Sequence, residues 1–313
     1  KLAKINLREH CFFDMVPEDF LMEYCETKNA ISKHVFESYD KPPNYEHLLS
    51  THILLQKIKS QKLKTDTADC KNLFLSSTHR KIMNTLLSED SYIDYNLFGT
   101  VTGRLTTLPD SFPILTIKRD FRKIVKPHND WFVSLDYNGA EVRTLLALSE
   151  QEQPDIDIHE WNMKNIFDEH KDVERDEAKT KFFSWLYNPD SDLIKTDYYN
   201  REKVLNLWYA DGKITTPFDR VIPVDQRKAL NYLIQSTTAD LVLDRAAAID
   251  EYLEGKKSFI SHIVHDEIVI DLADDERELL AEIKSIFSNN KLAKYVVNLK
   301  CGKNYLELEG LDL

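Results

Sequence analysis

The feature that most constrains the fold is an apolar run at residues 263–270, which the charged triplet His265-Asp266-Glu267 interrupts at its centre. Isoleucine and valine make up the run on both sides of the triplet, and β-branched residues favour strands. The run therefore predicts two strands joined by a tight turn, with Asp266 at the tip of the hairpin. Rigid strands would hold this carboxylate at the edge of a sheet.

A second apolar segment also ends in a carboxylate. Trp131–Leu135 is aromatic and β-branched, which predicts a strand, and Asp136 follows it directly. By itself, either aspartate is better explained as a turn former or a helix N-cap. Two carboxylates from separate strands can, however, hold a pair of Mg²⁺ ions roughly 3.5–4 Å apart, so Asp136 and Asp266 are candidate metal ligands.

Helices are predicted at four places. The pattern is helical from about residue 42 to residue 87, from Glu141, from Arg175 to Tyr187 and from Arg227 onward, and Asn188-Pro189 ends the third of these helices. The 313 residues are enough for about two domains. Only seven glycines occur, which excludes Gly-rich β architectures and favours a helix-rich α+β fold.

Two of these helices carry polar residues at four-residue spacing. In the first helix, two cations and then two aromatic rings share one face. Cations can bind phosphates and rings can pack on a sugar or base; the alternative is an amphipathic helix whose basic end only faces solvent. In the second, a row of donors either contacts base edges or faces water. The residues are Arg175, Lys179, Phe183 and Tyr187 in the first helix and Arg227, Asn231 and Gln235 in the second.

The chain is acidic, with 41 basic and 53 acidic residues and a net charge of −12. This charge argues against binding of nucleic acid through bulk charge alone, so any DNA contact must be local. Residues 51–82 reverse the balance, with seven basic against two acidic side chains, and a phosphate-binding face and a solvated face explain them equally well. A second basic cluster lies at residues 118–126.

The four cysteines, at positions 11, 25, 70 and 301, include no close pair for a redox motif or a zinc site. They favour a reducing compartment: the cytoplasm or nucleoid of a bacterium or an infected host cell, or an organelle. No apolar run approaches the ~18 residues that a membrane span needs, so we expect a soluble, intracellular protein without a membrane partner. The first residue is lysine, and we expect a fragment of a longer polypeptide.

Seven short motifs, in order, resemble the polymerase domain of family A DNA polymerases, the group of bacterial DNA polymerase I and its phage and organellar relatives. The resemblance covers the chain from about Phe98 to the C-terminus. Each motif is weak alone, but seven in the right order leave chance a negligible explanation. The motifs are Thr102–Thr107 (T-G-R-L), Asp136–Arg143 (motif A), Asp157-Ile158-His159 (D-I-H), Arg175–Tyr187 (motif B), Arg227–Gln235 (R-x3-N-x3-Q), His265-Asp266-Glu267 (motif C) and Gly302–Tyr305 (terminal G-x-N-W).

The resemblance implies a right-hand polymerase fold with an antiparallel palm sheet, helical fingers and a helical thumb that is divergent or incomplete. It places the thumb-like region in residues 1–90, the first part of the palm in 91–155, shortened fingers in 156–225 and the second part of the palm in 226–313. The implied activity is template-directed addition of dNTPs to the 3′ end of a primer by two-metal phosphoryl transfer. No proofreading exonuclease is expected in this chain; an upstream exonuclease or a replisome partner would supply one.

The resemblance also implies roles for individual residues at the metal site. Asp136 and Asp266 would bind two Mg²⁺ ions, which Mn²⁺ can replace, with help from the backbone of Tyr137. Glu267 would lie near the primer terminus, and Lys179 would protonate the departing pyrophosphate.

The remaining implied residues would bind the two substrates. The incoming dNTP would be held at its triphosphate, sugar and 2′ position by Tyr137, Glu141, His159, Arg175, Lys179, Phe183 and Tyr187. A hydrogen bond between Glu141 and Tyr187 would close the surface beneath the 2′ position. The primer–template would be contacted by Arg104, Arg227, Asn231, Gln235 and His265, with Lys62 and Lys64 where thumb helices should grip the duplex.

Motif A departs from the family pattern, since Asn138-Gly139-Ala140 replaces Ser-Gln-Ile. Two other activities are weighed against DNA polymerisation. A single-subunit RNA polymerase would lack Glu141 and usually Glu267. A catalytically weak or inactive polymerase-like DNA-binding module would lack a metal carboxylate, whereas both are present. An unrelated α+β domain is the least favoured alternative.

Overall fold

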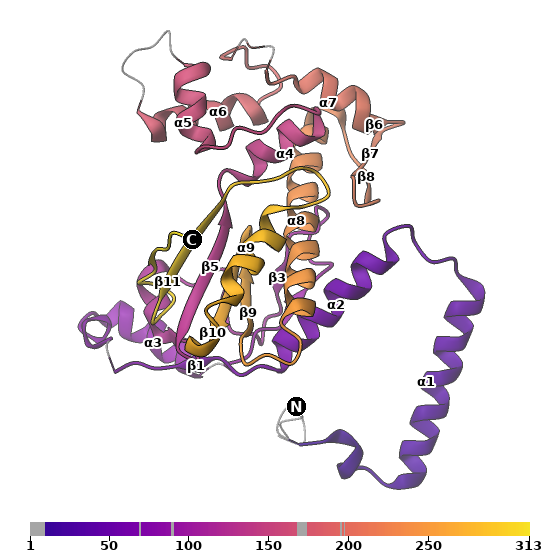
Figure 1. Ribbon diagram of the computed structural model, residues 1–313. Helices are drawn as coiled ribbons and strands as arrows, with labels where there is room; N and C mark the ends of the chain where they lie inside the picture. Colours follow the sequence, from indigo (N-terminus) through magenta and orange to yellow (C-terminus); the bar gives the residue numbers. More distant parts are fainter. Residues whose placement is uncertain (1–9, 69, 89–90, 168–173, 195, 197) are drawn as a thin grey trace. The chain divides into compact units, whose positions relative to one another are not determined.

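The computed structural model describes residues 10–68, 70–88, 91–167, 174–194, 196 and 198–313. Contacts divide the chain into two units, and the first ends at Tyr45 and the second begins at Glu46. The first unit contains the 3₁₀ helix η1 (Phe12–Met15) and the helix α1 (Glu18–Ser38), and every residue of α1 is at least partly exposed. The second unit carries the elements from α2 onward, many of which Figure 1 labels. All the predicted site residues belong to this unit.

A five-stranded antiparallel sheet forms the centre of the second unit, with the strand order β12-β11-β5-β10-β9. The predicted hairpin is confirmed, because β9 and β10 pair and only His265 and Asp266 lie between them. The predicted strand before Asp136 is also confirmed. The strands are β5 (Trp131–Tyr137), β9 (Phe259–Val264), β10 (Glu267–Leu272), β11 (Val297–Gly302) and β12 (Glu309–Gly310).

Helices pack along the sheet and continue beyond one end of it (Figure 1). The helices predicted from Glu141, from Arg175 to Tyr187 and from Arg227 are confirmed as α4, α6 and α8. Among the described helices, none has the length and apolar character that crossing a membrane requires. The helices are α2 (Tyr45–Ser60), α3 (Ser77–Ser88), α4 (Ala140–Leu148), α5 (Ile158–Asn165), α6 (Arg175–Tyr187), α7 (Arg201–Trp208), α8 (Gln226–Tyr252) and α9 (Leu279–Ser288).

Short elements connect these helices and strands. Three of them, β6, β7 and β8, form a small antiparallel sheet after α7, and β2 pairs with β3. The short elements are β1 (Lys64–Thr65), η2 (Lys71–Phe74), β2 (Tyr95–Asn96), β3 (Thr106–Thr107), η3 (Arg119–Ile124), β4 (Val125–Lys126), β6 (Tyr209–Ala210), β7 (Lys213–Thr215), β8 (Val221–Pro223) and η4 (Asp274–Glu276).

The predicted continuous helical pattern from residue 42 to residue 87 is wrong in its middle part. α2 ends at Ser60 and α3 begins at Ser77. Between them the backbone of Lys64 and Thr65 pairs with β4, and the side chain of Asp66 accepts a hydrogen bond from the amide of Ala68. Short polar side chains compete in this way with helical hydrogen bonds, so the apolar spacing alone was misleading.

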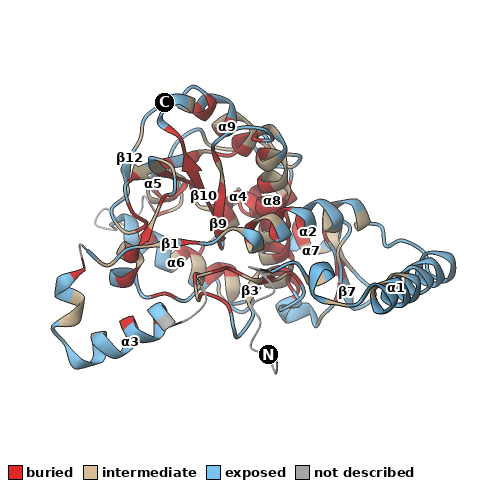
Figure 2. Ribbon diagram, turned by 90° about the horizontal axis from the view of Figure 1, so that it is seen from below, coloured by how far each residue is buried: buried red, intermediate tan, exposed pale blue. Residues whose placement is uncertain are grey.

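The described residues of the second unit form two hydrophobic cores. One joins the sheet to α2, α3, α9 and the later part of α8, and the other lies among α4, α5, α6, α7, β7, β8 and the first part of α8. Leu233 of α8 belongs to the second core and Leu241 to the first. Figure 2 shows the buried residues concentrated in the sheet strands and along α8. Because α8 belongs to both cores, it connects the sheet to the helices that lie beyond the end of the sheet.

His262 of β9 is a buried titratable residue in the sheet core. It is 0% exposed, and its ring packs edge-on against Phe132 and Tyr305, with centroids 5.7 and 4.6 Å away. Its Nε2 has no hydrogen-bond partner in the described part of the chain. Burial, with a smaller effect of Arg122, lowers the pKa of His262 to about 3. The ring is therefore neutral in the folded protein at pH 7.

We predict that His262 makes the fold sensitive to acid. In the unfolded chain the imidazole binds a proton below about pH 6.5, but in the folded protein only near pH 3, so stability is lost as the pH falls between these values. At pH 4.5 the loss is about 2 to 3 kcal/mol. Urea unfolding at pH 7.5 and 4.5 should show a smaller acid effect for His262→Phe than for the wild type. An equal fall in both proteins would contradict this prediction.

Candidate active site

Two carboxylates meet at one end of the five-stranded sheet. Asp136 lies near the end of β5 and faces Glu267 of β10 on one side and Asn298 of β11 on the other. Asp266 lies in the turn that immediately precedes β10. Asp136 and Asp266 line the same cavity of about 200 Å³. The structure therefore brings together the two aspartates that the sequence selected as candidate metal ligands.

The pKa of Asp136 is shifted by its surroundings in this cavity. Burial and the neighbouring carboxylates Asp266 and Glu267 raise the pKa of Asp136 to about 7, although Lys300 and Asn298 act in the opposite direction. Among the described residues, no cluster of three or more side chains suited to bind a metal occurs. A cation at the two aspartates would therefore need further ligands from the backbone, the solvent or a substrate.

α6 presents its stripe of cations and aromatic rings to the same cavity. Arg175, Lys179 and Phe183 line it, together with His159 of α5. The ring of Phe183 has centroid separations of 6.1 Å from His159 and 6.0 Å from Tyr187. The four-residue spacing thus places cations and rings on one face of the helix, as the sequence predicts. The first three residues of this face line the cavity that holds the aspartates, whereas Tyr187 does not.

His159 is almost enclosed near the start of α5. It is 3% exposed, and burial together with the positive charge of Lys179 lowers its pKa to about 4. The imidazole is neutral near pH 7 and so does not add a third positive charge beside Lys179 and Arg175. A neutral imidazole still offers one N–H donor to an anionic ligand.

A glycine lets β5 turn directly into α4. Gly139 has φ +64°, a left-handed conformation that glycine adopts without strain. A Cβ atom at this position would lie 2.3 Å from Cγ2 of Ile158, so a larger residue does not fit between the turn and α5. This departure from the family pattern therefore allows a close approach of α5, which carries His159, to the strand end that carries Asp136.

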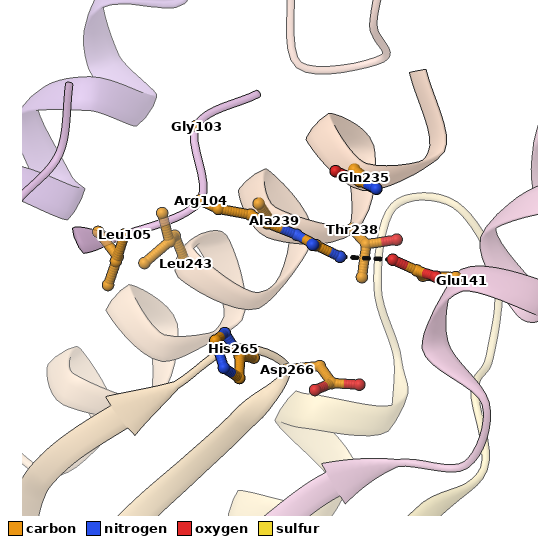
Figure 3. Close-up of a pocket in the computed structure, with 10 residues that line it drawn as sticks. All are labelled: Gly103, Arg104, Leu105, Glu141, Gln235, Thr238, Ala239, Leu243, His265 and Asp266. Carbon is orange, nitrogen blue, oxygen red and sulfur yellow. Dashed lines mark hydrogen bonds and ion pairs between the residues drawn. The ribbon is translucent and has the colours of Figure 1, made fainter. Parts of the chain in front are cut away.

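Glu141, in the first turn of α4, connects three separate segments. Its carboxylate accepts hydrogen bonds from the Tyr187 hydroxyl of α6 and from the Arg104 guanidinium. The bond to Tyr187 is the one that the resemblance predicts. Figure 3 shows Arg104 pointing toward Glu141 across a cavity of about 290 Å³, which His265 and Asp266 also line. Glu141 and Asp266 line both cavities, so the two cavities adjoin.

Two of the predicted site residues direct their side chains away from the cavities. Tyr137 is buried and its hydroxyl donates to the backbone oxygen of Phe287 at 2.7 Å, which leaves its backbone as the part near the aspartates. Glu267 accepts hydrogen bonds from the hydroxyls of Ser134, at 2.5 Å, and Tyr305, at 2.9 Å. Its carboxylate is anchored on the sheet and does not line either cavity.

The predicted DNA contacts on α8 divide between two cavities. Gln235 lines the 290 Å³ cavity and donates a hydrogen bond to Asn231. Asn231 and Arg227 line a separate cavity of about 240 Å³ between α6, α7 and α8. Arg227 is paired with Asp190, with 2.6 Å between Nη2 and Oδ2.

Lys62 and Lys64 are exposed and line none of these three cavities. Lys64 belongs to β1, whose pairing with β4 sets Lys64 opposite Lys126. This pairing brings the two basic clusters of the sequence side by side. Lys57, in the same basic stretch, is instead neutralised within the protein by Asp250 at 2.7 Å and Glu254 at 2.9 Å.

Polar residues that were not predicted from the sequence surround Asp136 on the sheet. Asn298 and Lys300 of β11 face Asp136 and Ser134 of β5. The alternation Val297-Asn298-Leu299-Lys300 is typical of a strand with one polar face, and it was an available signal. It does not reveal, however, that this strand lies beside β5.

Comparison with solved structures finds a polymerase-like fold. The chain is similar to the POL domain of Pol1 from M. smegmatis in complex with DNA primer-template and dNTP, with a TM-score of 0.58 and 19% sequence identity. The match covers 76% of this chain and 52% of that one, so the chain matches about half the length of the solved domain. No protein-family profile and no curated protein matches the chain.

Proposed function

We propose that this chain is a DNA polymerase of the family A type, which adds dNTPs to the 3′ end of a primer on a DNA template. The observation that carries the proposal is the cavity that Asp136 and Asp266 share with Arg175, Lys179 and Phe183. Nucleotidyl transfer needs carboxylates for metal ions and cations for phosphates at one place. The similarity in fold to a DNA polymerase domain supports the same reaction.

The two aspartates fit Mg²⁺, for which Mn²⁺ can substitute. Mg²⁺ is usually bound by one or two carboxylates together with substrate phosphates, and Asp136 and Asp266 provide this number of ligands. Burial, followed by repulsion from Asp266 and Glu267, raises the pKa of Asp136, and a bound cation would offset this repulsion. Asp136, Asp266 and the backbone of Tyr137 would hold two ions, which when bound stabilise charge on the attacking and leaving oxygens.

The residues on α5 and α6 would bind the incoming dNTP. Arg175 and Lys179 would pair with the triphosphate, and the neutral His159 would donate its N–H to the same group. Lys179 would also give a proton to the pyrophosphate as it leaves. Phe183, which follows the two cations along α6, would pack against the sugar.

The 290 Å³ cavity would receive the primer terminus and the template. Its lining includes Arg104, Gln235 and His265, whose side chains donate hydrogen bonds. Asn231 and Arg227 would continue this row along α8. In the right-hand description, the five-stranded sheet would be the palm, α5, α6 and α7 the fingers, and the region before residue 90 the thumb, with Glu267 acting near the primer terminus.

The proposal is tested by extension of a labelled primer–template with the purified chain, Mg²⁺ and the four dNTPs. Extension that follows the template supports it. Tight binding of DNA without extension would favour the polymerase-like binding module, and efficient extension with rNTPs would favour an RNA polymerase. Without dNTPs the primer should not be shortened, because we propose that any exonuclease lies upstream or in a replisome partner.

We predict that Lys62 and Lys64 contribute to DNA affinity through phosphate contacts. If each contacts one phosphate, the double variant Lys62→Gln/Lys64→Gln should lower the slope of log Kd against log salt by about 2. Lys57→Gln is the matched control, because its charge is already paired with Asp250 and Glu254, and it should leave the slope unchanged. An unchanged slope in the double variant would mean that the DNA does not contact Lys62 and Lys64. Titrations of a fluorescent primer–template between 50 and 300 mM salt measure the slope.

A further inference from the structure

Asp157 joins the start of α5 to the start of α6. Its Oδ1 accepts hydrogen bonds from the backbone amides of His159, at 2.9 Å, and Glu160, at 3.0 Å, and so caps α5. Its Oδ2 accepts from the Arg175 guanidinium at 2.7 Å. Arg175 is 44% exposed, so its position over the cavity depends on ion pairs rather than on close packing. The shorter pair is with the half-buried Asp157, and a longer one, at 3.6 Å, is with the exposed Asp176.

Asn138 supplies the remaining hydrogen bond to this carboxylate. Its Nδ2 donates to Oδ2 of Asp157 at 2.7 Å, the same oxygen that receives Arg175. Its Oδ1 accepts from the amide of Ile158 at 2.8 Å and from Arg143 at 3.3 Å. The side chain is 5% exposed. Donors on one side and a carboxylate on the other fix which way the amide points.

Arg143 holds the backbone around this contact. It is 0% exposed and donates to the backbone oxygens of Asn138, Pro154 and Ile156 at 2.7, 2.9 and 2.7 Å. The turn after β5 and the segment before α5 are thereby tied together. Asn138 thus reaches Asp157 from a buried, hydrogen-bonded support, and Arg175 is the exposed end of the series.

We infer that Asn138 is a positioning residue, which holds Asp157 so that Asp157 directs Arg175 toward the triphosphate of the incoming nucleotide. The inference rests on the proposed function. The geometry explains why asparagine occupies this position. An aspartate would place a second carboxylate against Asp157, and a serine side chain is one heavy atom shorter than the reach that the contact requires.

The test is the steady-state kinetics of Asn138→Asp, which replaces one NH₂ group by an oxygen. We expect the KM for dNTP to rise roughly tenfold, with kcat and the Kd for primer–template within about twofold of the wild type. Because the effect is transmitted through Arg175, the same substitution in an Arg175→Ala background should change KM no further. Asn138→Ser is the second variant, to be used if Asn138→Asp does not fold. It should also raise KM while leaving kcat and the Kd for primer–template nearly unchanged.

Asn162 is the matched control. It is a fully buried asparagine of α5 that contacts the Tyr199 hydroxyl at 2.5 Å and has no part in the contacts of Asp157. Asn162→Ala should lower stability without raising KM selectively. An unchanged KM in both Asn138 variants, a fall in kcat alone, or an equal rise of KM in the Arg175→Ala background would overturn the inference. Failure of the wild type to extend any primer would instead overturn the proposed function, and the inference with it.

Discussion

Asp136→Asn and Asp266→Asn should each abolish nucleotide addition, with a loss of at least roughly 10³-fold in the rate of primer extension. Both side chains line the cavity that Arg175 and Lys179 share, and asparagine keeps their size but not their charge. Metal ions serve mainly the chemical step, so the affinity for primer–template should stay within about twofold. Single-turnover extension measures the rate, and fluorescence anisotropy of labelled DNA measures the affinity.

The Asp136→Asn variant also provides a control for folding. The pKa of Asp136 is raised to about 7 from an ordinary value near 4, so the folded protein binds this proton more tightly than the unfolded chain does. Ionisation of Asp136 therefore lowers the free energy of unfolding progressively as the pH rises from 4 to 7, and this loss of stability stays constant above pH 7. Asparagine does not ionise, so Asp136→Asn should be more stable than the wild type in thermal unfolding. The difference should be larger at pH 8 than at pH 5. Near-native extension by either variant would exclude that aspartate from the metal site.

Glu141→Ala should reduce the preference for deoxyribonucleotides over ribonucleotides by roughly 10²-fold. Hydrogen bonds from Tyr187 and Arg104 hold the Glu141 carboxylate from two sides. A 2′-hydroxyl placed against this surface would clash or leave a polar group unpaired, and alanine opens the space. The measurement is the ratio of kcat/KM for a dNTP to that for the corresponding rNTP in primer extension.

Two further variants separate this effect from a general change in the site. Tyr187→Phe removes one hydrogen bond to Glu141 but leaves the carboxylate in place, so it should change the ratio in the same direction and by less. Glu177→Ala removes an exposed carboxylate of α6 that pairs with Lys181, and it should leave the ratio unchanged. The same ratio in Glu141→Ala and the wild type would mean that the sugar does not lie against Glu141.

The sequence by itself determined the local elements that carry the site. β-branched residues on both sides of the triplet His265-Asp266-Glu267 predicted the hairpin, and Asn188-Pro189 predicted the end of α6 at Tyr187, as observed. Side-chain periodicity and turn chemistry act over a few residues, so they are legible in the sequence. The order of the motifs added the polymerase-like fold, which the structural comparison confirms at this coarse level.

Local patterns failed where a distant segment competed with them. The spacing of apolar residues predicted a helix through residues 61–76, but the backbone at Lys64 and Thr65 pairs with β4 instead. The partner strand lies about 60 residues later in the chain. A pairing over this distance is decided by packing, which helical periodicity does not describe.

The tertiary structure alone decided most of the contacts among the charged and polar groups of the site. Nothing in the sequence pairs Asp136 with Glu267 and Asn298, joins Arg104 to Glu141, or directs Asn138 to Asp157. These contacts depend on strand order, on register and on the close approach of two backbones at Gly139. Electrostatic interactions and pKa values depend on distance and burial. The residue types of the site and the pair Glu141–Tyr187 were therefore predictable from the sequence, whereas most other partners and the charge states came only with the fold.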